Sequence, residues 1–265
     1  MTDLWLPERI REHVAGKAYE QNEVGMSGSK VFMFDDMVLK IQRADSETEN
    51  EVQVCRWLDG RIPTPGVIEY LVEGDTAYSL MTRVRGKMLC DPFYMNHPDV
   101  LLDTMVQAFR MLWAVDIGDC PCDSSLDVKL ARAAYMVEHG LVDMELTEPE
   151  TFGENGFSSP RALLQWLEAN RPGEEPVLSH GDFCLPNLFA EAGRVTGFID
   201  LGRMGTADRW QDLALAYRSL KHNFEGVYSG GKRYEGFPPK LLFERLGIET
   251  DRNKLNYYIL LDELF

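Results

Sequence analysis

Three side chains between residues 178 and 203 have the types and the spacing that phosphoryl transfer needs. They are Asp182, Asn187 and Asp200, in the sequence LSHGDFCLPNLFAEAGRVTGFIDLGR. A carboxylate can orient a hydroxyl nucleophile and take its proton, while an amide and a second carboxylate supply hard oxygen ligands for Mg²⁺ on a nucleotide. We therefore predict a base at Asp182 and a magnesium site at Asn187 and Asp200.

Each part of this stretch also has a purely structural interpretation. An HGD triplet alone is typical of a capped turn, and Asp200 alone can end a buried strand. The combination is more specific, because an Asn follows the HGD turn and an apolar hairpin, with strands at 187–190 and 195–199, then leads to IDLGR. His180 is expected to tie its ring to a nearby backbone group or carboxylate. Asp212 has two open interpretations, a brace for the catalytic turn or a surface ion pair.

A second group of candidates near the N-terminus would contact the triphosphate of the nucleotide. In the run GMSGSK, residues 25–30, glycines let backbone N–H groups approach a phosphate, and Ser27 could donate a hydrogen bond to the β-phosphate. Lys40 lies between two apolar residues on a predicted strand and so points to the opposite face. We predict that it contacts the α- and β-phosphates. A plain hairpin and a solvated lysine also fit the local sequence.

Lys40 needs a carboxylate to hold it, and the next predicted helix, residues 46–58, offers three. Glu51 precedes an apolar position of this helix by three residues, which places it near the inward face. We assign Glu51 as the partner of Lys40 and expect Glu47 and Glu49 to be solvated.

Two structural units would have to bring these candidates together. The first part of the chain is rich in strands, and the second has apolar residues at helical spacing. Gly and Pro collect at residues 86–98, so we predict a nucleotide-binding lobe at residues 1–86 and a catalytic and substrate-binding lobe at residues 87–265. Further strands are expected at 19–24, 31–34, 37–41, 67–73 and 78–84, and helices at 4–15, 46–58, 100–115, 125–138 and 160–169.

The composition narrows the classes of partner. A formal charge of −16 argues against a nucleic-acid backbone and permits a cationic partner, although acidity for solubility is the more ordinary explanation of the charge alone. No apolar run approaches the length that crosses a bilayer, and the first residues lack the apolar centre of a signal peptide. We therefore expect a cytoplasmic protein with no membrane partner.

Four motifs together resemble the aminoglycoside 3'-phosphotransferases. They are HGDFCLPN at 180–187, GFIDLGR at 197–203, ADRWQDLALAYRS at 207–219 and LLDELF at 260–265, and the resemblance covers almost the whole chain. It implies an α+β, two-lobed, protein-kinase-like fold with a small antiparallel β lobe. It also implies ATP- and Mg²⁺-dependent phosphorylation of a hydroxyl, most simply the 3'-hydroxyl, of an aminoglycoside such as kanamycin or neomycin, which confers resistance. The choice between ATP and GTP stays open.

The resemblance assigns roles to further residues. It implies that backbone groups of Thr82 and Val84 contact adenine, and that Arg203 lies beside the catalytic aspartate and the substrate. The acidic loop at 143–157 corresponds to a loop that contacts the drug, and Glu150 and Glu154 are our candidates within it.

The end of the chain carries the last predicted substrate contacts, at Asp262, Glu263 and Phe265. Bare acids at a terminus are normally frayed. Here an apolar helix precedes them, which argues for docking and would gather two side-chain carboxylates and the α-carboxylate into an anionic pocket for amino groups. The resemblance implies the same use of the tail.

Two other functions compete with this interpretation. A kinase for another amino or hydroxy metabolite, such as choline or a sugar, would need the same phosphate machinery. A non-catalytic nucleotide-binding module is the second alternative, and the joint presence of Lys40, Asp182, Asn187 and Asp200 argues against it.

Overall fold

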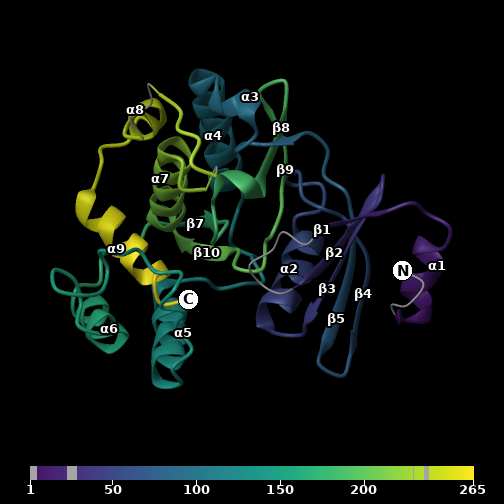
Figure 1. Ribbon diagram of the computed structural model, residues 1–265, viewed down its shortest axis with the longest axis horizontal. Coiled ribbons are helices and arrows are strands. Elements are labelled where there is room, and N and C mark those ends of the chain that lie inside the picture. The colour runs from purple at the N-terminus through teal and green to yellow at the C-terminus, as the bar shows by residue number, and fades with distance from the viewer. Residues whose placement is uncertain (1–4, 23–28, 229, 236–238) are drawn as a thin grey trace.

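The structure is a computed structural model that describes residues 5–22, 29–228, 230–235 and 239–265. The chain forms a sheet-rich lobe, which holds β1 to β5, and a larger, mainly helical lobe (Figure 1). Ser27, predicted as a phosphate contact, lies outside the described residues. None of the helices in the described ranges is long and apolar enough to cross a membrane.

The described strands of the small lobe form one antiparallel sheet in the order β1-β2-β3-β5-β4. In the central strand β3, Leu39 and Ile41 are buried, and Lys40 lies on the opposite face, as the strand alternation predicts. Helix α1 (Glu8–Val14) buries its apolar side chains with Leu39 in a small core. The strand bounds are Glu20–Asn22 for β1, Lys30–Met33 for β2, Met37–Arg43 for β3, Val67–Glu73 for β4 and Thr76–Thr82 for β5.

Helix α2 (Ser46–Trp57) belongs to the small lobe by sequence but packs into the core of the large one. Its start is fixed by a capping box, in which Asp45 accepts from the backbone of Thr48 and Thr48 accepts from the backbone of Asp45. Its apolar residues Val52 and Val54 belong to the same buried cluster as the helices of the large lobe. Because α2 contacts both lobes, it can position residues of both.

The domain boundary near Gly86 stays a prediction.

The large lobe surrounds its catalytic hairpins with helices. Strands β6, β8 and β9 form one small antiparallel sheet and β7 and β10 another. The helix bounds are Pro92–Met95 for α3, Pro98–Trp113 for α4, Leu126–Glu138 for α5, Pro160–Ala169 for α6, Arg209–Glu225 for α7, Leu241–Leu246 for α8 and Arg252–Asp262 for α9. The strand bounds are Lys87–Met88 for β6, Pro176–Ser179 for β7, Leu188–Glu191 for β8, Arg194–Phe198 for β9 and Gly205–Asp208 for β10.

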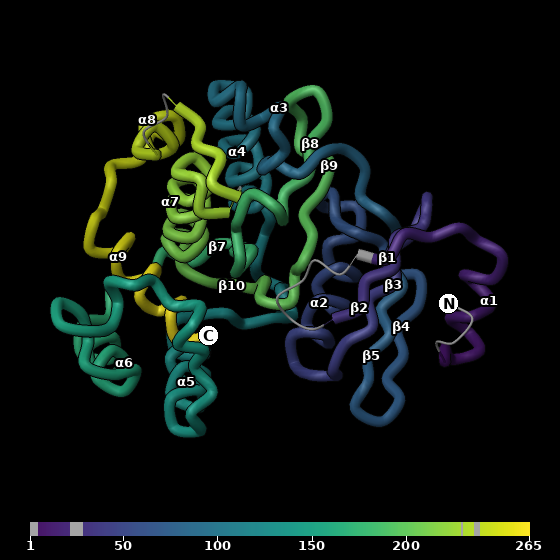
Figure 2. The backbone as a smooth tube through the Cα atoms, viewed as in Figure 1, coloured from purple at the N-terminus to yellow at the C-terminus, as the bar shows by residue number. Residues whose placement is uncertain are grey.

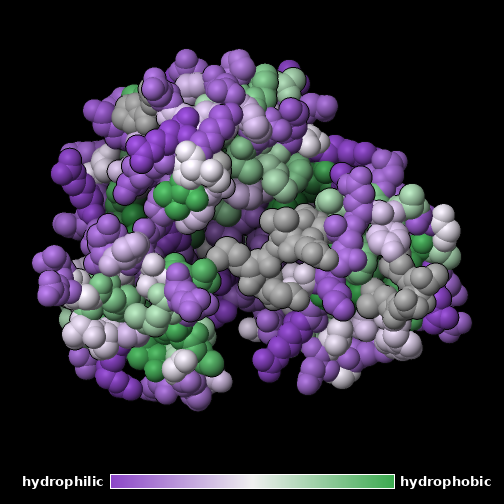
Figure 3. Space-filling model, in the orientation of Figure 1, coloured by the Kyte–Doolittle hydropathy of each residue, from purple (hydrophilic) through white to green (hydrophobic). Residues whose placement is uncertain are grey.

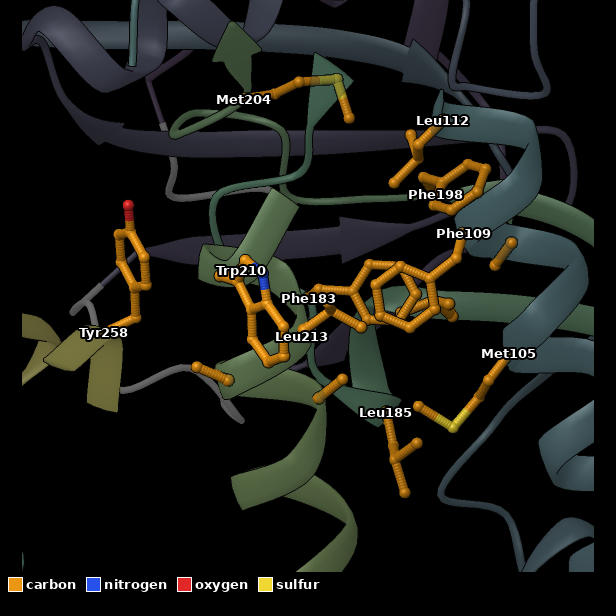
Figure 4. Close-up of a cluster of buried hydrophobic side chains, with 14 of the residues drawn as sticks. Met105, Phe109, Leu112, Phe183, Leu185, Phe198, Met204, Trp210, Leu213 and Tyr258 are labelled. Carbon is orange, nitrogen blue, oxygen red and sulfur yellow. The ribbon is translucent and has the colours of Figure 1, made fainter. Parts of the chain in front are cut away.

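The core of the large lobe lies directly beneath the catalytic turn. Phe183, one residue after Asp182, stacks on Phe109 of α4 with ring centroids 4.1 Å apart, and both are fully buried. Phe198, at the end of β9, and Trp210, on α7, belong to the same cluster (Figure 4). This packing anchors the turn to rigid elements on both sides.

The helices and strands predicted from the sequence are present with shifted bounds. Helix α4 begins at Pro98, two residues before the prediction, because proline suits the first helical turn. Asn187 lies in a short 3-10 helix (Leu185–Asn187) and not in strand β8, which starts at Leu188. The chain ends beside α5, on the opposite side of the molecule from α1 (Figure 2).

Candidate active site

A cavity of about 440 Å³ opens where the two lobes meet, and half of the predicted site residues line it. On the face of the molecule that Figure 3 shows, hydrophilic residues predominate and apolar residues gather in separate patches. The lining comes from the end of β3, from α2, from the catalytic turn, from the loop at 143–148, from α7 and from the tail. Its acids are Asp45, Glu47, Glu51, Asp143, Glu148, Asp182, Asp200, Asp262 and Glu263, and its arginines are Arg43, Arg203 and Arg218.

The turn that carries Asp182 is held by a buried carboxylate. Asp212, fully buried on α7, accepts hydrogen bonds from the Ser179 hydroxyl at 2.9 Å and from the backbone N–H groups of His180 and Gly181 at 2.7 and 3.0 Å. Of the two open interpretations of Asp212, the brace is therefore correct and the surface ion pair is wrong. Gly181 has φ 82°, and a Cβ there would collide with the carbonyl oxygen of Arg203, so only glycine fits.

The structural role predicted for His180 is confirmed. The ring is fully buried, its Nε2 donates to the carbonyl of Ile199 at 3.1 Å, and its Nδ1 accepts from the backbone N–H of Asp182 at 3.3 Å. Both ring nitrogens are therefore occupied, and the histidine ties the catalytic turn to the end of the hairpin that leads to Asp200.

The Asp182 carboxylate points toward Asn187. The Asn187 side-chain amide donates to Oδ2 of Asp182 at 2.9 Å and to its backbone carbonyl at 3.1 Å. Burial raises the pKa of Asp182, and the negative charges of Asp262 and Asp200 raise it further against the opposing effects of His180 and Arg203. A raised pKa of Asp182 was not needed for the predicted role, because in a loose transition state the orientation of the hydroxyl matters more than its deprotonation.

The residues predicted to hold Mg²⁺ fit that ion. The Asn187 amide group already donates to Asp182, which leaves its oxygen for a cation, and the backbone N–H of Ile199 donates to the carbonyl of Asn187 at 3.0 Å, next to Asp200. In the described part of the chain, no three His, Cys, Asp or Glu side chains gather as a metal site. One amide and one carboxylate suit Mg²⁺ nonetheless, because this ion takes its other ligands from phosphates and water.

Lys40 contacts the carboxylate that the sequence assigned to it. Its Nζ lies 2.8 Å from Oε1 of Glu51, whose side chain is 4% exposed, and 3.6 Å from Oδ1 of Asp200. Burial works to lower the pKa of Lys40, but the charges of Glu51 and Asp200 outweigh it and raise the pKa above its ordinary value. The lysine is therefore charged and lies next to the predicted metal ligand.

The expectation that Glu47 is solvated was wrong. Its carboxylate pairs with Arg132 on α5 and with Nε of Arg203 at 3.1 Å, so it joins the two lobes across the cavity. Burial raises the pKa of Glu47, and the two arginines more than compensate and hold it below its usual range. Arg203 also lies 3.7 Å from Asp262, which places it between α2 and the tail.

The segment predicted to contact adenine already uses part of its hydrogen-bonding capacity. The backbone N–H of Thr82 donates to the carbonyl of Gly66 at 2.8 Å, and the Thr82 hydroxyl accepts from the Gly66 N–H. The Val84 side chain packs against Gly197, where a Cβ would leave it no room. An adenine contact at Thr82 would thus use its carbonyl, and both roles stay predictions.

The tail is docked, as predicted, but its acids are already paired. Leu264 is fully buried, and Phe265 packs its ring against Arg132, Lys129 and Arg203, with 5.4 to 5.8 Å between the charged groups and the ring centre. These contacts fix the end of the chain against α5.

Arg218 on α7 organises the two acids of the tail. It pairs with Asp262, and its Nη1 lies 3.0 Å from Oε1 of Glu263. The Glu263 side chain is only 2% exposed, and it also accepts from the backbone N–H of Glu148 at 2.6 Å. Both carboxylate oxygens of Glu263 thus contact protein groups, and of the two tail side chains Asp262, one-fifth exposed, is the one that a ligand can reach.

In the acidic loop the structure brings different residues to the cavity than the sequence suggested. Among the described residues that line it, Asp143 and Glu148 occur, and Glu150 and Glu154 do not; both of the latter are exposed. Glu148 also lies 3.1 Å from Nε2 of the buried His222. The run of acids indicated the loop, but charge alone cannot tell which side chains face inward.

This arrangement, a small antiparallel lobe with a Lys–Glu pair above an Asp–Asn–Asp centre, is that of kinase-like phosphotransferases, and known proteins share it. The model of the phosphotransferase enzyme family matches residues 18–238. An aminoglycoside 3'-phosphotransferase of Enterococcus faecalis is 35% identical over 91% of this chain and 91% of its own length. One of Campylobacter jejuni is 34% identical over 95% of this chain and 97% of its own length.

Solved structures agree with these relatives. The crystal structure of an aminoglycoside-3'-phosphotransferase of type VIII is 30% identical, with a TM-score of 0.80 and 97% of each chain covered. The structure of aminoglycoside phosphotransferase APH(3'')-Id from Streptomyces rimosus in complex with ADP and streptomycin is 26% identical, with a TM-score of 0.77 and with 96% of this chain and 95% of that chain covered. The chain belongs to the phosphotransferase enzyme family and, within it, to the aminoglycoside 3'-phosphotransferases.

Proposed function

We propose that this chain transfers the γ-phosphoryl group of ATP to the 3'-hydroxyl of an aminoglycoside such as kanamycin or neomycin, and that it thereby confers resistance. One observation carries the proposal: Asp182 lines an acid-rich cavity between the Lys40–Asp200 pair and the docked tail. The names of the relatives and the complex of a similar structure with ADP and streptomycin support it. Because ATP is a cytoplasmic metabolite, we place the reaction in the cytoplasm.

In this proposal, each group of the site has one task. Asp182 accepts a hydrogen bond from the attacking hydroxyl and takes its proton, which its raised pKa favours. Lys40 contacts the α- and β-phosphates. Mg²⁺ held by Asn187 and Asp200 would neutralise charge between the β- and γ-phosphates. GTP offers the same phosphates, so it is a second candidate donor.

The cationic substrate would meet the acids that protein groups leave accessible. Asp143 is exposed, and Asp262 and Glu148 are partly exposed beside their basic partners. Ammonium groups of an aminoglycoside can add further ion pairs to these carboxylates, whereas a neutral sugar offers them no charge. This favours a polyamine substrate over the sugar kinase alternative.

An assay of drug-dependent ADP release tests the proposal. We expect turnover with kanamycin and neomycin and none with a drug that lacks the 3'-hydroxyl, with choline or with glucose. Equal turnover on the 3'-deoxy drug would move the site of attack to another hydroxyl. Turnover on choline or glucose alone would replace the aminoglycoside by another metabolite.

A further inference from the structure

The segment that follows α7 brings an aromatic side chain back over the helix. Helix α7 ends at Glu225, and Gly226 adopts the left-handed conformation with φ 89°, which glycine alone adopts freely. The backbone N–H groups of Gly226 and Val227 both donate to the carbonyl of His222, so the chain reverses over the last helical turn. The next residue is Tyr228, which lines the cavity.

Tyr228 is held in place and yet uncovered. Its ring meets the ring of His222 edge to face, with centroids 5.0 Å apart and planes at 70°. His222 is itself buried and lies 3.1 Å from Glu148 of the acidic loop. Despite this support, 63% of Tyr228 is exposed. A large apolar ring that packing orients but does not cover is poised for contact with a ligand.

A second apolar side chain from another element lies on the lining of the same cavity. Leu146, in the acidic loop, is 57% exposed and lines the cavity together with Tyr228. Single exposed apolar residues are ordinary, but two that converge on a cavity otherwise lined by acids need an explanation. An ammonium ion alone would make no use of Leu146, which offers it neither a charge nor an aromatic face.

Amino sugars match this mixture of surfaces. The ring of an amino sugar presents a face of C–H groups, which packs on an aromatic ring, and carries ammonium groups, which the face of an aromatic ring attracts. The carboxylates of Asp143 and Glu148 lie on the same lining and would pair with those ammonium groups.

We propose that Tyr228, with Leu146, forms an apolar platform on which an outer amino-sugar ring of the substrate stacks, while the ring that is phosphorylated lies at Asp182. This platform would make Tyr228 a determinant of specificity for drugs with several rings. The inference rests on the proposed function, because it assumes an aminoglycoside in the cavity.

The test compares neomycin with neamine, the fragment of neomycin that lacks the outer rings. In Tyr228→Ala we expect KM and Kd for neomycin to rise about three- to ten-fold, with kcat little changed, as the loss of one aromatic contact implies. The affinity for neamine should change less than about two-fold on the same basis. Tyr228→Phe keeps the ring and should retain most of the affinity for neomycin.

Val227→Ala is the matched control, because Val227 is equally exposed, at 60%, and lies outside the set of described residues that line the cavity. It should leave both affinities unchanged. Neomycin binding to Tyr228→Ala at wild-type affinity, or an equal loss of affinity for neomycin and neamine, would overturn the platform. Binding is measured by calorimetry without turnover, so a wild-type protein that binds neomycin but does not phosphorylate it would refute the proposed function and not the platform.

Discussion

Ion pairs hold the charged side chains on two sides of the cavity, but the roles of acid and base are reversed between the two sides. We call Lys40, Glu51 and Asp200 the nucleotide wall. Glu51 and Asp200 line the cavity, and the buried carboxylate of Glu51 holds Lys40 next to Asp200. On the drug wall, formed by Arg218, Asp262, Glu263 and Glu148, an arginine holds two carboxylates of the tail, and one of these holds the acidic loop. In the proposed function, the first wall would offer a cation to phosphates and the second would offer anions to amines.

The comparison shows what ion pairs contribute at a binding site. Removing one partner of a buried pair is costly, about 3–5 kcal/mol, because the other charge is left uncompensated. Each wall therefore keeps its charged groups in one orientation before any ligand arrives, which reduces the entropy that binding must overcome. A substitution of Asp182, between the two walls, should therefore lower kcat. A substitution in one wall should raise the KM of one substrate, either the nucleotide or the drug.

The largest expected effect comes from the residue between the walls. Asp182→Ala should lower kcat about 10²- to 10⁴-fold, because it removes the group that orients the hydroxyl and takes its proton. The affinity for ADP should stay close to wild type, since Lys40 and Glu51 are untouched. Turnover by coupled assay and ADP binding by calorimetry check the two parts. Near wild-type turnover would show that Asp182 is not the base.

Most residues of the nucleotide wall and of the catalytic turn could be predicted from the sequence. Their contacts join residues that are close in the chain or that lie on one face of a helix or strand. His180, Asp182 and Asn187 lie within one turn, and the hairpin of β8 and β9 returns the chain to Asp200 beside them. The partner of Lys40 followed from the inward face of α2. These predictions used periodicity and short spacing, which the backbone alone enforces.

The drug wall was less accessible to sequence reasoning, because its contacts join distant segments. Arg218 meets Glu263 across 45 residues, and the carboxylate of Glu263 meets the backbone of Glu148 across 115. Glu47 was wrongly expected to be solvated, because its partner Arg203 lies 156 residues away. A run of acidic residues indicates a charged surface but does not tell which side chains face the cavity. The sequence pattern therefore gave no physical reason to choose Glu150 and Glu154.

Arg218→Ala tests the drug wall and is expected to have the second largest effect. With Glu263 buried and uncompensated, the tail and the acidic loop should both shift, and KM for kanamycin should rise about ten-fold or more, as for loss of a buried ion-pair partner. The KM for ATP should change little. Arg218→Lys, which keeps the charge, should recover part of the affinity.

The mirror-image control is Glu51→Gln, which releases Lys40 and should raise the KM for ATP and spare that for kanamycin. Thermal melting of both variants identifies any general loss of folding. If Arg218→Ala raised both KM values alike, the two walls would not be independent and the comparison would fail.

A pH profile sharpens the comparison at the point where the walls meet. Asp182 must be ionised to accept a proton, and burial and Asp262 raise its pKa, so activity should be lost on acidification at a higher pH than an ordinary aspartate would give. Asp262→Asn removes a charge that raises this pKa and should move the acid limb of kcat/KM to lower pH. Arg203→Met removes a charge that lowers it and should move the limb to higher pH. Shifts in the same direction would contradict this account.

The smallest expected effect separates the acids that face the cavity from those that do not. Asp143→Asn should raise KM for kanamycin about two- to five-fold, the range for an exposed ion pair, and the difference should shrink at high salt. The double variant Glu150→Gln, Glu154→Gln removes more charge from the same loop but none from the cavity lining. It should therefore change KM by less than about two-fold. If the double variant weakened kanamycin binding as much as Asp143→Asn, the loop would act through its total charge, and the fixed geometry of the drug wall would not extend to it.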